Sequence, residues 1–131
     1  MSTLIEIAES EQLRTARSGR GFTLVRIAPS GWAARSDEIR ALHALVKAHL
    51  RKTDVVVTVR ERELGALLVE TVGVGAFCAV ARVRQILRGA PELGVRVGWA
   101  SVGPGQRRTW EEAWRWAGQL LVADAAIPAA A

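Results

Sequence analysis

Apolar side chains recur along this chain with two different spacings, and the spacings predict which segments are helices and which are strands. Ile39, Leu42 and Val46 follow one another at intervals of three or four residues, as on one face of an amphipathic helix. Two short apolar runs, 55–59 and 64–69, are separated by four charged residues. Apolar runs of this length on either side of a polar turn indicate a β-hairpin.

Capping and turn-forming residues divide the rest of the chain into further elements. Ser36 and Thr109 are suited to begin helices, because a hydroxyl oxygen can accept a hydrogen bond from a free N–H of the first turn. Clusters of glycine and proline close the other segments. The expected order is helix 4–17, strand 22–28, helix 36–51, strands 54–59 and 64–70, helix 76–87, strand 95–102 and helix 110–123.

This order places a hairpin between two strand–helix–strand units. It predicts an α/β protein of the α+β sandwich type, a ferredoxin-like palm with a central mixed sheet covered by helices. At 131 residues and 50% hydrophobic content, we expect residues 1–131 to form one domain around a single core. The tail 125–131 is expected to be frayed.

Composition and charge narrow the possible functions. The chain has 18 basic and 13 acidic residues, and its formal charge of +5 can attract phosphate groups. The arginines are scattered rather than interleaved with exposed aromatic residues, so nucleic-acid binding is not favoured. No apolar run approaches the ~20 residues that cross a bilayer, and the first residues do not resemble a secretory signal. We therefore expect a cytoplasmic protein without membrane insertion.

Cysteine and tryptophan suggest few sites by themselves. The single cysteine, Cys78, lies in an apolar stretch and is expected to be a buried, inert thiol. Trp110 and Trp114 lie one helical turn apart, so they form a stripe that either covers the core or docks a partner. Trp32, in a predicted loop, is a better candidate for an exposed contact.

Several short segments occur in an order and spacing that characterise one protein family. They are 16–20, the pattern from Ile39 to Asp54, 79–84 and 95–100. In these segments the chain resembles GGDEF domains, the catalytic modules of diguanylate cyclases, and at the position of their Gly-Gly-Asp/Glu-Glu-Phe turn it has Arg60-Glu61-Arg62-Glu63-Leu64. The resemblance implies the palm fold of nucleotidyl cyclases and a place in bacterial second-messenger signal transduction.

The departures from the family fall on its catalytic positions. The resemblance implies that Arg26, Ala28 and Arg62 stand where the family has acidic residues, two of which hold divalent metal ions. Cations at such positions would repel magnesium. Arg60 and Glu61 replace glycines that allow phosphates to approach the backbone. We therefore expect a non-catalytic domain without a metal or other cofactor. Because arginine and glutamate alternate in the tetrad 60–63, its charges are expected to neutralise one another in a solvated turn.

One binding element of the family has a counterpart here. Arg51 and Asp54 match the RxxD motif that binds the product cyclic di-GMP in many GGDEF domains, and Arg82 falls where the family has a further arginine of that site. A guanidinium can bind a phosphate or a guanine edge, and a carboxylate can accept from guanine N1 and N2. A purely structural role is the alternative, in which Arg51 is a solvated charge at a helix end and Asp54 only begins a strand.

Three functional hypotheses follow. In the first, the domain binds cyclic di-GMP and regulates a protein partner. In the second, the same fold has lost all nucleotide contacts and serves as a protein-interaction or homodimerisation scaffold. In the third, which is the least favoured, the palm is a divergent nucleotidyl cyclase or polymerase with relocated metal ligands.

Overall fold

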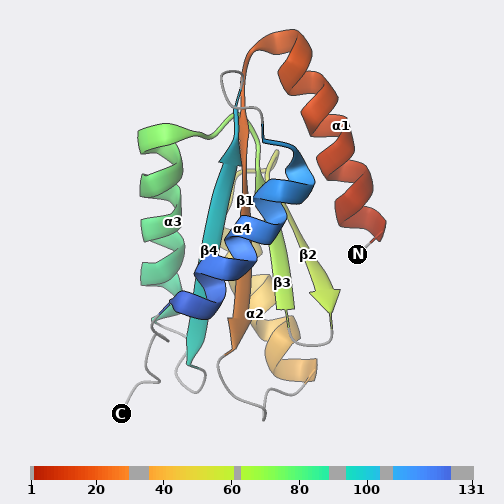
Figure 1. Cartoon of the computed structure of the whole chain (residues 1–131). Coiled ribbons are helices and arrows are strands. Elements are labelled where there is room, and N and C mark those ends of the chain that lie inside the picture. Colours follow the sequence, from red (N-terminus) through yellow and green to blue (C-terminus); the bar gives the residue numbers. More distant parts are fainter. Residues whose placement is uncertain (1, 30–35, 61–62, 89–93, 104–107, 125–131) are drawn as a thin grey trace.

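A computed structural model describes residues 2–29, 36–60, 63–88, 94–103 and 108–124 of the chain (Figure 1). Trp32, Glu61, Arg62 and the tail 125–131 lie outside the described residues, and so does the side chain of Arg60. No helix in the described part is long and apolar enough to span a membrane.

The element order agrees with the sequence prediction, and most boundaries lie within two residues of it. Strand β4 and helix α4 have the expected limits, and the hydroxyl of Thr109 accepts from the backbone N–H of Glu112 at 3.2 Å, which caps α4. Helix α3 begins three residues earlier than expected. The elements are α1 (Ser2–Ser18), β1 (Phe22–Pro29), α2 (Ser36–His49), β2 (Val55–Arg60), β3 (Glu63–Leu68), α3 (Gly73–Leu87), β4 (Val95–Val102) and α4 (Trp110–Ala123).

The four strands form one sheet in the order β2-β3-β1-β4. The expected α+β palm is confirmed, but the sheet is antiparallel at every pairing and not mixed. The reason lies in the crossover from β1 through α2 to β2, which leaves one position free between these two strands. Strand β3 turns back through the hairpin and occupies that position, so each strand has only antiparallel neighbours.

Helices cover both faces of the sheet (Figure 1). One core lies between the sheet and helices α2 and α3, and its members include Ile27, Val46 and Val83. The second core lies on the opposite face under α1 and α4, and its members include Leu4, Leu24 and Trp114. Side chains that alternate along β1 therefore enter different cores, as expected for a strand buried on both faces.

The tryptophan stripe has the first of its two expected roles, covering the core, whereas the expectation for Cys78 is wrong. Trp110 and Trp114 are only 7% and 8% exposed and belong to the core under α4, so they fill space between helix and sheet and do not form a docking surface. Cys78 is exposed, because α3 turns the side of the helix that carries it away from the sheet. The apolar stretch around Cys78 is a helix with one buried face.

Candidate functional site

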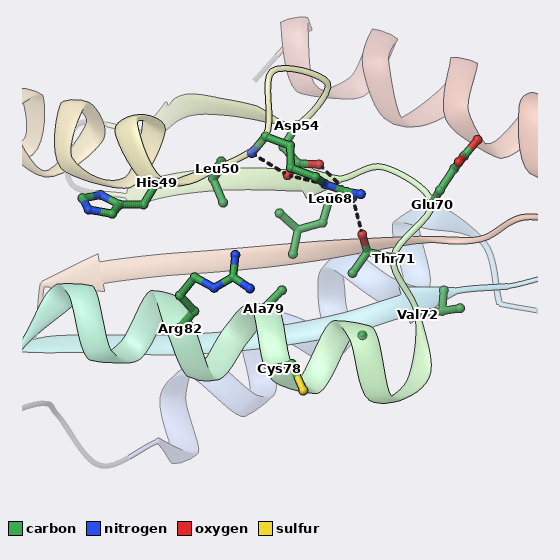
Figure 2. A pocket seen from close by; sticks show the side chains of 12 residues that line it. His49, Leu50, Asp54, Leu68, Glu70, Thr71, Val72, Cys78, Ala79 and Arg82 are labelled. Atoms are coloured by element: carbon green, nitrogen blue, oxygen red, sulfur yellow. Dashed lines mark hydrogen bonds and ion pairs between the residues drawn. The ribbon is translucent and has the colours of Figure 1, made fainter.

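An open pocket of about 410 Å³ lies between the C-terminal end of α2, the start of β2 and helix α3 (Figure 2). Arg51, Asp54 and Arg82, which the sequence analysis selected, all line this pocket. The first two come from the turn that joins α2 to β2, and Arg82 comes from the middle of α3, 28 residues after Asp54. The fold thus brings together residues that only the family resemblance connected.

The turn from Arg51 to Asp54 is closed by hydrogen bonds in both directions. The backbone N–H of Asp54 donates to the carbonyl of Arg51 at 3.0 Å, and the backbone N–H of Arg51 donates to Asp54 Oδ2 at 3.1 Å. Asp54 Oδ1 accepts from the backbone N–H of Val69, just beyond the end of β3, at 3.0 Å. Asp54 is only 4% exposed, so its carboxylate is first of all a buried link between two backbone segments.

The guanidinium of Arg51 is oriented by acceptors on the neighbouring chain segment. Arg51 Nη2 donates to the carbonyl of Val69 and to Thr71 Oγ1, both at 2.6 Å. Its contacts with the Asp54 carboxylate are longer, at 3.4 and 3.5 Å. The side chain is 58% exposed, so it lies across the surface of the pocket and can be reached by a ligand.

Arg82 is the second cation of the pocket and is less constrained. It is exposed, and Figure 2 shows its side chain directed from α3 into the space below Leu50 and Leu68. Within the part of the chain that the structure describes, Arg82 makes no hydrogen bond or ion pair. An exposed guanidinium beside an open pocket has donors that an anionic ligand can use.

Sequence reasoning missed two residues of this pocket, Glu70 and Thr71. Glu70 has a backbone φ of +53°, which is uncommon for a residue other than glycine. Its carboxylate forms ion pairs with Arg20 at 3.1 Å and with Arg14 at 3.6 Å. Neither the acid nor the threonine belongs to a motif, and their roles come from a bend after β3 that the sequence does not indicate.

A separate cluster surrounds Arg26 on the opposite face of the sheet. Arg26 Nε donates to Glu63 Oε1 at 2.7 Å, and the two side chains are only 14% and 8% exposed. Arg26 Nη1 also donates to the carbonyl of Trp114 at 3.2 Å, and its guanidinium lies 4.4 Å from the centre of the Trp114 ring. The interpretation of Glu63 as part of a solvated turn is therefore wrong. The signal that could have found the pair is Arg26 itself, because a charge within an apolar strand needs a buried partner.

Glycines make room for this cluster. Gly65 and Gly98 are the residues paired with Arg26 on the two neighbouring strands. A Cβ atom at Gly98 would meet the backbone of α4 at Ala117 and Leu121, and one at Gly118 would meet Arg26 Nη1. Helix α4 therefore rests directly on the backbone of the sheet and closes over the ion pair.

Of the other positions aligned with the catalytic turn and first strand, the structure describes the side chains of Leu64 and Ala28, and neither brings a charged group to this cluster. Leu64 is fully buried in the core on the α2 and α3 face, and Ala28 is half-buried opposite Arg96 of β4. Among the described residues, no group of three or more His, Cys, Asp or Glu side chains is arranged to hold a metal ion.

The strand order, the antiparallel pairing and the helices on both faces define a palm fold of the GGDEF type, and this expectation is confirmed by comparison with solved structures. Over 93% of its length the chain resembles the diguanylate cyclase SiaD from Pseudomonas aeruginosa, crystallised with its activator SiaC, with a TM-score of 0.81 and 19% sequence identity. It spans about half of that protein, 53%.

Two isolated GGDEF domains are similarly close in structure. The FimX GGDEF domain from Pseudomonas aeruginosa gives a TM-score of 0.77 at 13% identity, over 93% of this chain and 88% of that one. The DgcB GGDEF domain from Caulobacter crescentus, in complex with cyclic di-GMP, gives 0.79 at 10% identity, over 93% and 82%. No protein-family model matches the sequence, and no curated protein matches it either. At these identities the likeness is one of fold.

Proposed function

We propose that this domain is a non-catalytic receptor for cyclic di-GMP in the bacterial cytoplasm and that ligand binding regulates a protein partner. The observation that carries the proposal is that Arg51, Asp54 and Arg82 line one open pocket. Two guanidinium groups face this pocket, whereas the carboxylate of Asp54 is paired with Arg51 and that of Glu70 is paired with Arg14 and Arg20. The exposed guanidinium donors therefore suit a ligand that carries phosphates.

The bound ligand would use the two arginines differently. Arg82 is not engaged by other described residues, so it can bind a phosphate with both arms of its guanidinium. Arg51 is held by Val69 and Thr71 and would present its remaining donors to a guanine edge. Guanine N1–H and N2–H would replace the two long contacts from Arg51 to Asp54, and the two backbone hydrogen bonds to Asp54 would remain.

The proposed absence of catalysis rests on the ion pair of Arg26 and Glu63. By resemblance, Arg26 stands at a metal-ligand position, and its guanidinium already neutralises the neighbouring acid. Trp114 and helix α4 cover the pair, which leaves both side chains nearly buried. A magnesium ion would have to displace the Arg26 guanidinium, which is fixed to the chain, from a nearly buried site. This displacement is unfavourable both electrostatically and sterically.

Calorimetric titration with cyclic di-GMP tests the receptor. We expect binding by the unmodified domain and a loss of at least about tenfold in affinity for Arg82→Ala, because a lost charged hydrogen bond is worth about 1.5–3 kcal/mol. Arg40→Ala, which removes an exposed arginine of α2 outside the pocket, is the matched control and should bind normally. Absence of heat at high micromolar ligand, or equal losses in both variants, would reject the receptor.

Incubation with GTP and either Mg²⁺ or Mn²⁺ tests the proposed lack of activity. We expect no cyclic or linear dinucleotide, and chromatographic detection of either product would overturn this part of the proposal. It would favour the divergent cyclase instead.

A protein-interaction scaffold is the second candidate, and exposed apolar residues on α3 favour it. Val74 is 80% exposed and Phe77 is 66% exposed, and both lie in the first half of the helix that carries Arg82. If cyclic di-GMP does not bind, we propose that this exposed apolar surface of α3 binds a protein. A pull-down would then test protein binding, and Phe77→Ser, which removes part of the surface, would be the control.

A further inference from the structure

We propose that Arg14 and Arg20 set the anion affinity of the pocket by holding the carboxylate of Glu70, one of its lining residues, away from Arg82. They are positioning residues that act through Glu70 and touch no ligand. The identity of the ligand rests on the proposed function, whereas the effect of the two arginines on the charge of the pocket does not.

The geometry places Glu70 between two pairs of arginines. Arg14 and Arg20 lie on one side, and Arg51 and Arg82 of the pocket lie on the other. Its backbone lies between Val69 and Thr71, the two residues whose oxygens accept from Arg51. Its side chain nevertheless points towards α1 and away from Arg82 (Figure 2). There Arg20 Nη1 lies 3.1 Å from Oε2 and Arg14 Nη2 lies 3.6 Å from Oε1.

The backbone conformation of Glu70 is consistent with this restraint. A φ of +53° costs free energy for a residue with a side chain, and it persists where neighbouring contacts fix it. Here the contacts are the ion pairs to Glu70 on one side and the hydrogen bond from Arg51 to Thr71 on the other. Glu70 is about one-third exposed, at 34%, so its side chain has room to turn.

The charges around the pocket indicate where Glu70 would turn if the two arginines were removed. The end of α2 contributes His49, the turn after it contributes Arg51, and α3 contributes Arg82. Asp54 is buried, and its carboxylate accepts short hydrogen bonds from two backbone N–H groups, so its contacts with the Arg51 guanidinium are long. Because Arg51 and Arg82 are then the neighbouring guanidinium groups, a released Glu70 carboxylate would move towards them and compete with an anionic ligand.

Helix α1, through Arg14, and the connection from α1 to β1, through Arg20, are therefore coupled to the anion affinity of the pocket. A contact that engages Arg14 and Arg20, such as an acidic segment of a partner, would release Glu70 and lower anion affinity. By linkage, a bound anion would disfavour that contact by the same factor.

The single cysteine allows a test that does not depend on cyclic di-GMP. Cys78 is exposed and lines the pocket, so its reaction rates with two disulfide reagents report the local potential. Dithiobis-nitrobenzoate is dianionic and dithiodipyridine is neutral. Because both react with the same thiolate, the ratio of their rates cancels changes in thiolate fraction and accessibility.

We expect Arg14→Ala/Arg20→Ala to lower the ratio of anionic to neutral reagent rates by about threefold to tenfold, which corresponds to about 0.7–1.4 kcal/mol. Adding Glu70→Gln should restore the ratio. The matched control Arg17→Ala/Arg40→Ala removes two other exposed arginines and should change it little. Arg14 and Arg20 are more than half exposed, at 55% and 68%, so the fold should tolerate their loss, which circular dichroism will verify.

The outcomes separate this inference from the proposed function. An unchanged ratio overturns the inference, and so does a fall that persists in the triple variant, because the arginines would then act directly and not through Glu70. Titration of the same variants with cyclic di-GMP should show the same order of affinities. If the unmodified domain binds no cyclic di-GMP but the thiol ratios behave as expected, the receptor fails and the inference about pocket charge stands.

Discussion

The ion pair between Arg26 and Glu63 should be the most sensitive point of the fold, and a double-mutant cycle can measure it. Methionine at either position keeps much of the volume and removes the charge. Two unit charges about 4 Å apart attract by about 4 kcal/mol at an effective dielectric constant of 20. In the native protein the cost of removing both charges from water offsets part of this attraction. When only one partner is removed, the remaining charge still bears its desolvation cost and has no attraction to offset it.

The magnitudes follow from what each variant leaves behind. Arg26→Met leaves the Glu63 carboxylate, 8% exposed, without its cation, so we expect a loss of about 3 kcal/mol. Glu63→Met leaves Arg26 with the Trp114 carbonyl and ring, so about 2 kcal/mol is expected. The double variant replaces the pair by apolar groups and should lose no more than Arg26→Met alone, which gives a coupling of about 2 kcal/mol.

Urea unfolding followed by circular dichroism measures the three free-energy differences. The stability of a domain of this size is about 5–15 kcal/mol, and sulfate can be added to keep the weakest variant folded. The reasoning is refuted if the two single losses add in the double variant to within about 0.5 kcal/mol. Additivity would mean that Arg26 and Glu63 are stabilised by separate surroundings and not by each other.

Three substitutions outside the ion pair test how the fold is held together, each measured by urea unfolding. Gly98→Ala should cost about 3 kcal/mol, because the new methyl group would meet the backbone of α4, and an unchanged stability would show that the helix can move away freely. Asp54→Ala should cost about 2 kcal/mol, because it leaves the partly buried N–H groups of Arg51 and Val69 without their acceptor, and a loss below about 0.5 kcal/mol would contradict this. Thr109→Ala should cost about 1 kcal/mol through loss of the helix cap, whereas Thr109→Ser should cost much less.

The parts of the fold that were predictable from sequence are those set by local patterns. Apolar spacing gave the helices and strands, and Thr109 marked the start of α4. The order of elements identified the palm, since few topologies accommodate a hairpin between two crossovers. The antiparallel character of the whole sheet was not predicted, because it depends on which position β3 occupies between β1 and β2 and not on any residue pattern.

The candidate sites were predicted unevenly for a similar reason. Arg51, Asp54 and Arg82 were selected because a resemblance assigned them to one binding site, and their position around one pocket depends on the tertiary structure. Glu70 was missed because its role depends on a positive φ and on two arginines about 50 residues earlier in the chain. Long-range contacts of this kind leave no local signal.

The tight seating of α4 on the sheet has an evolutionary consequence. Changing Arg26 to an acid would place two carboxylates side by side beneath the Trp114 ring and its carbonyl oxygen, in the space that the guanidinium now fills. Gly98 and Gly118 allow α4 to lie close to the sheet and to Arg26, so α4 would have to move away from the sheet to make room for a metal ion. A metal site at this position would therefore require several simultaneous substitutions, and single mutational steps towards it would pass through destabilised proteins.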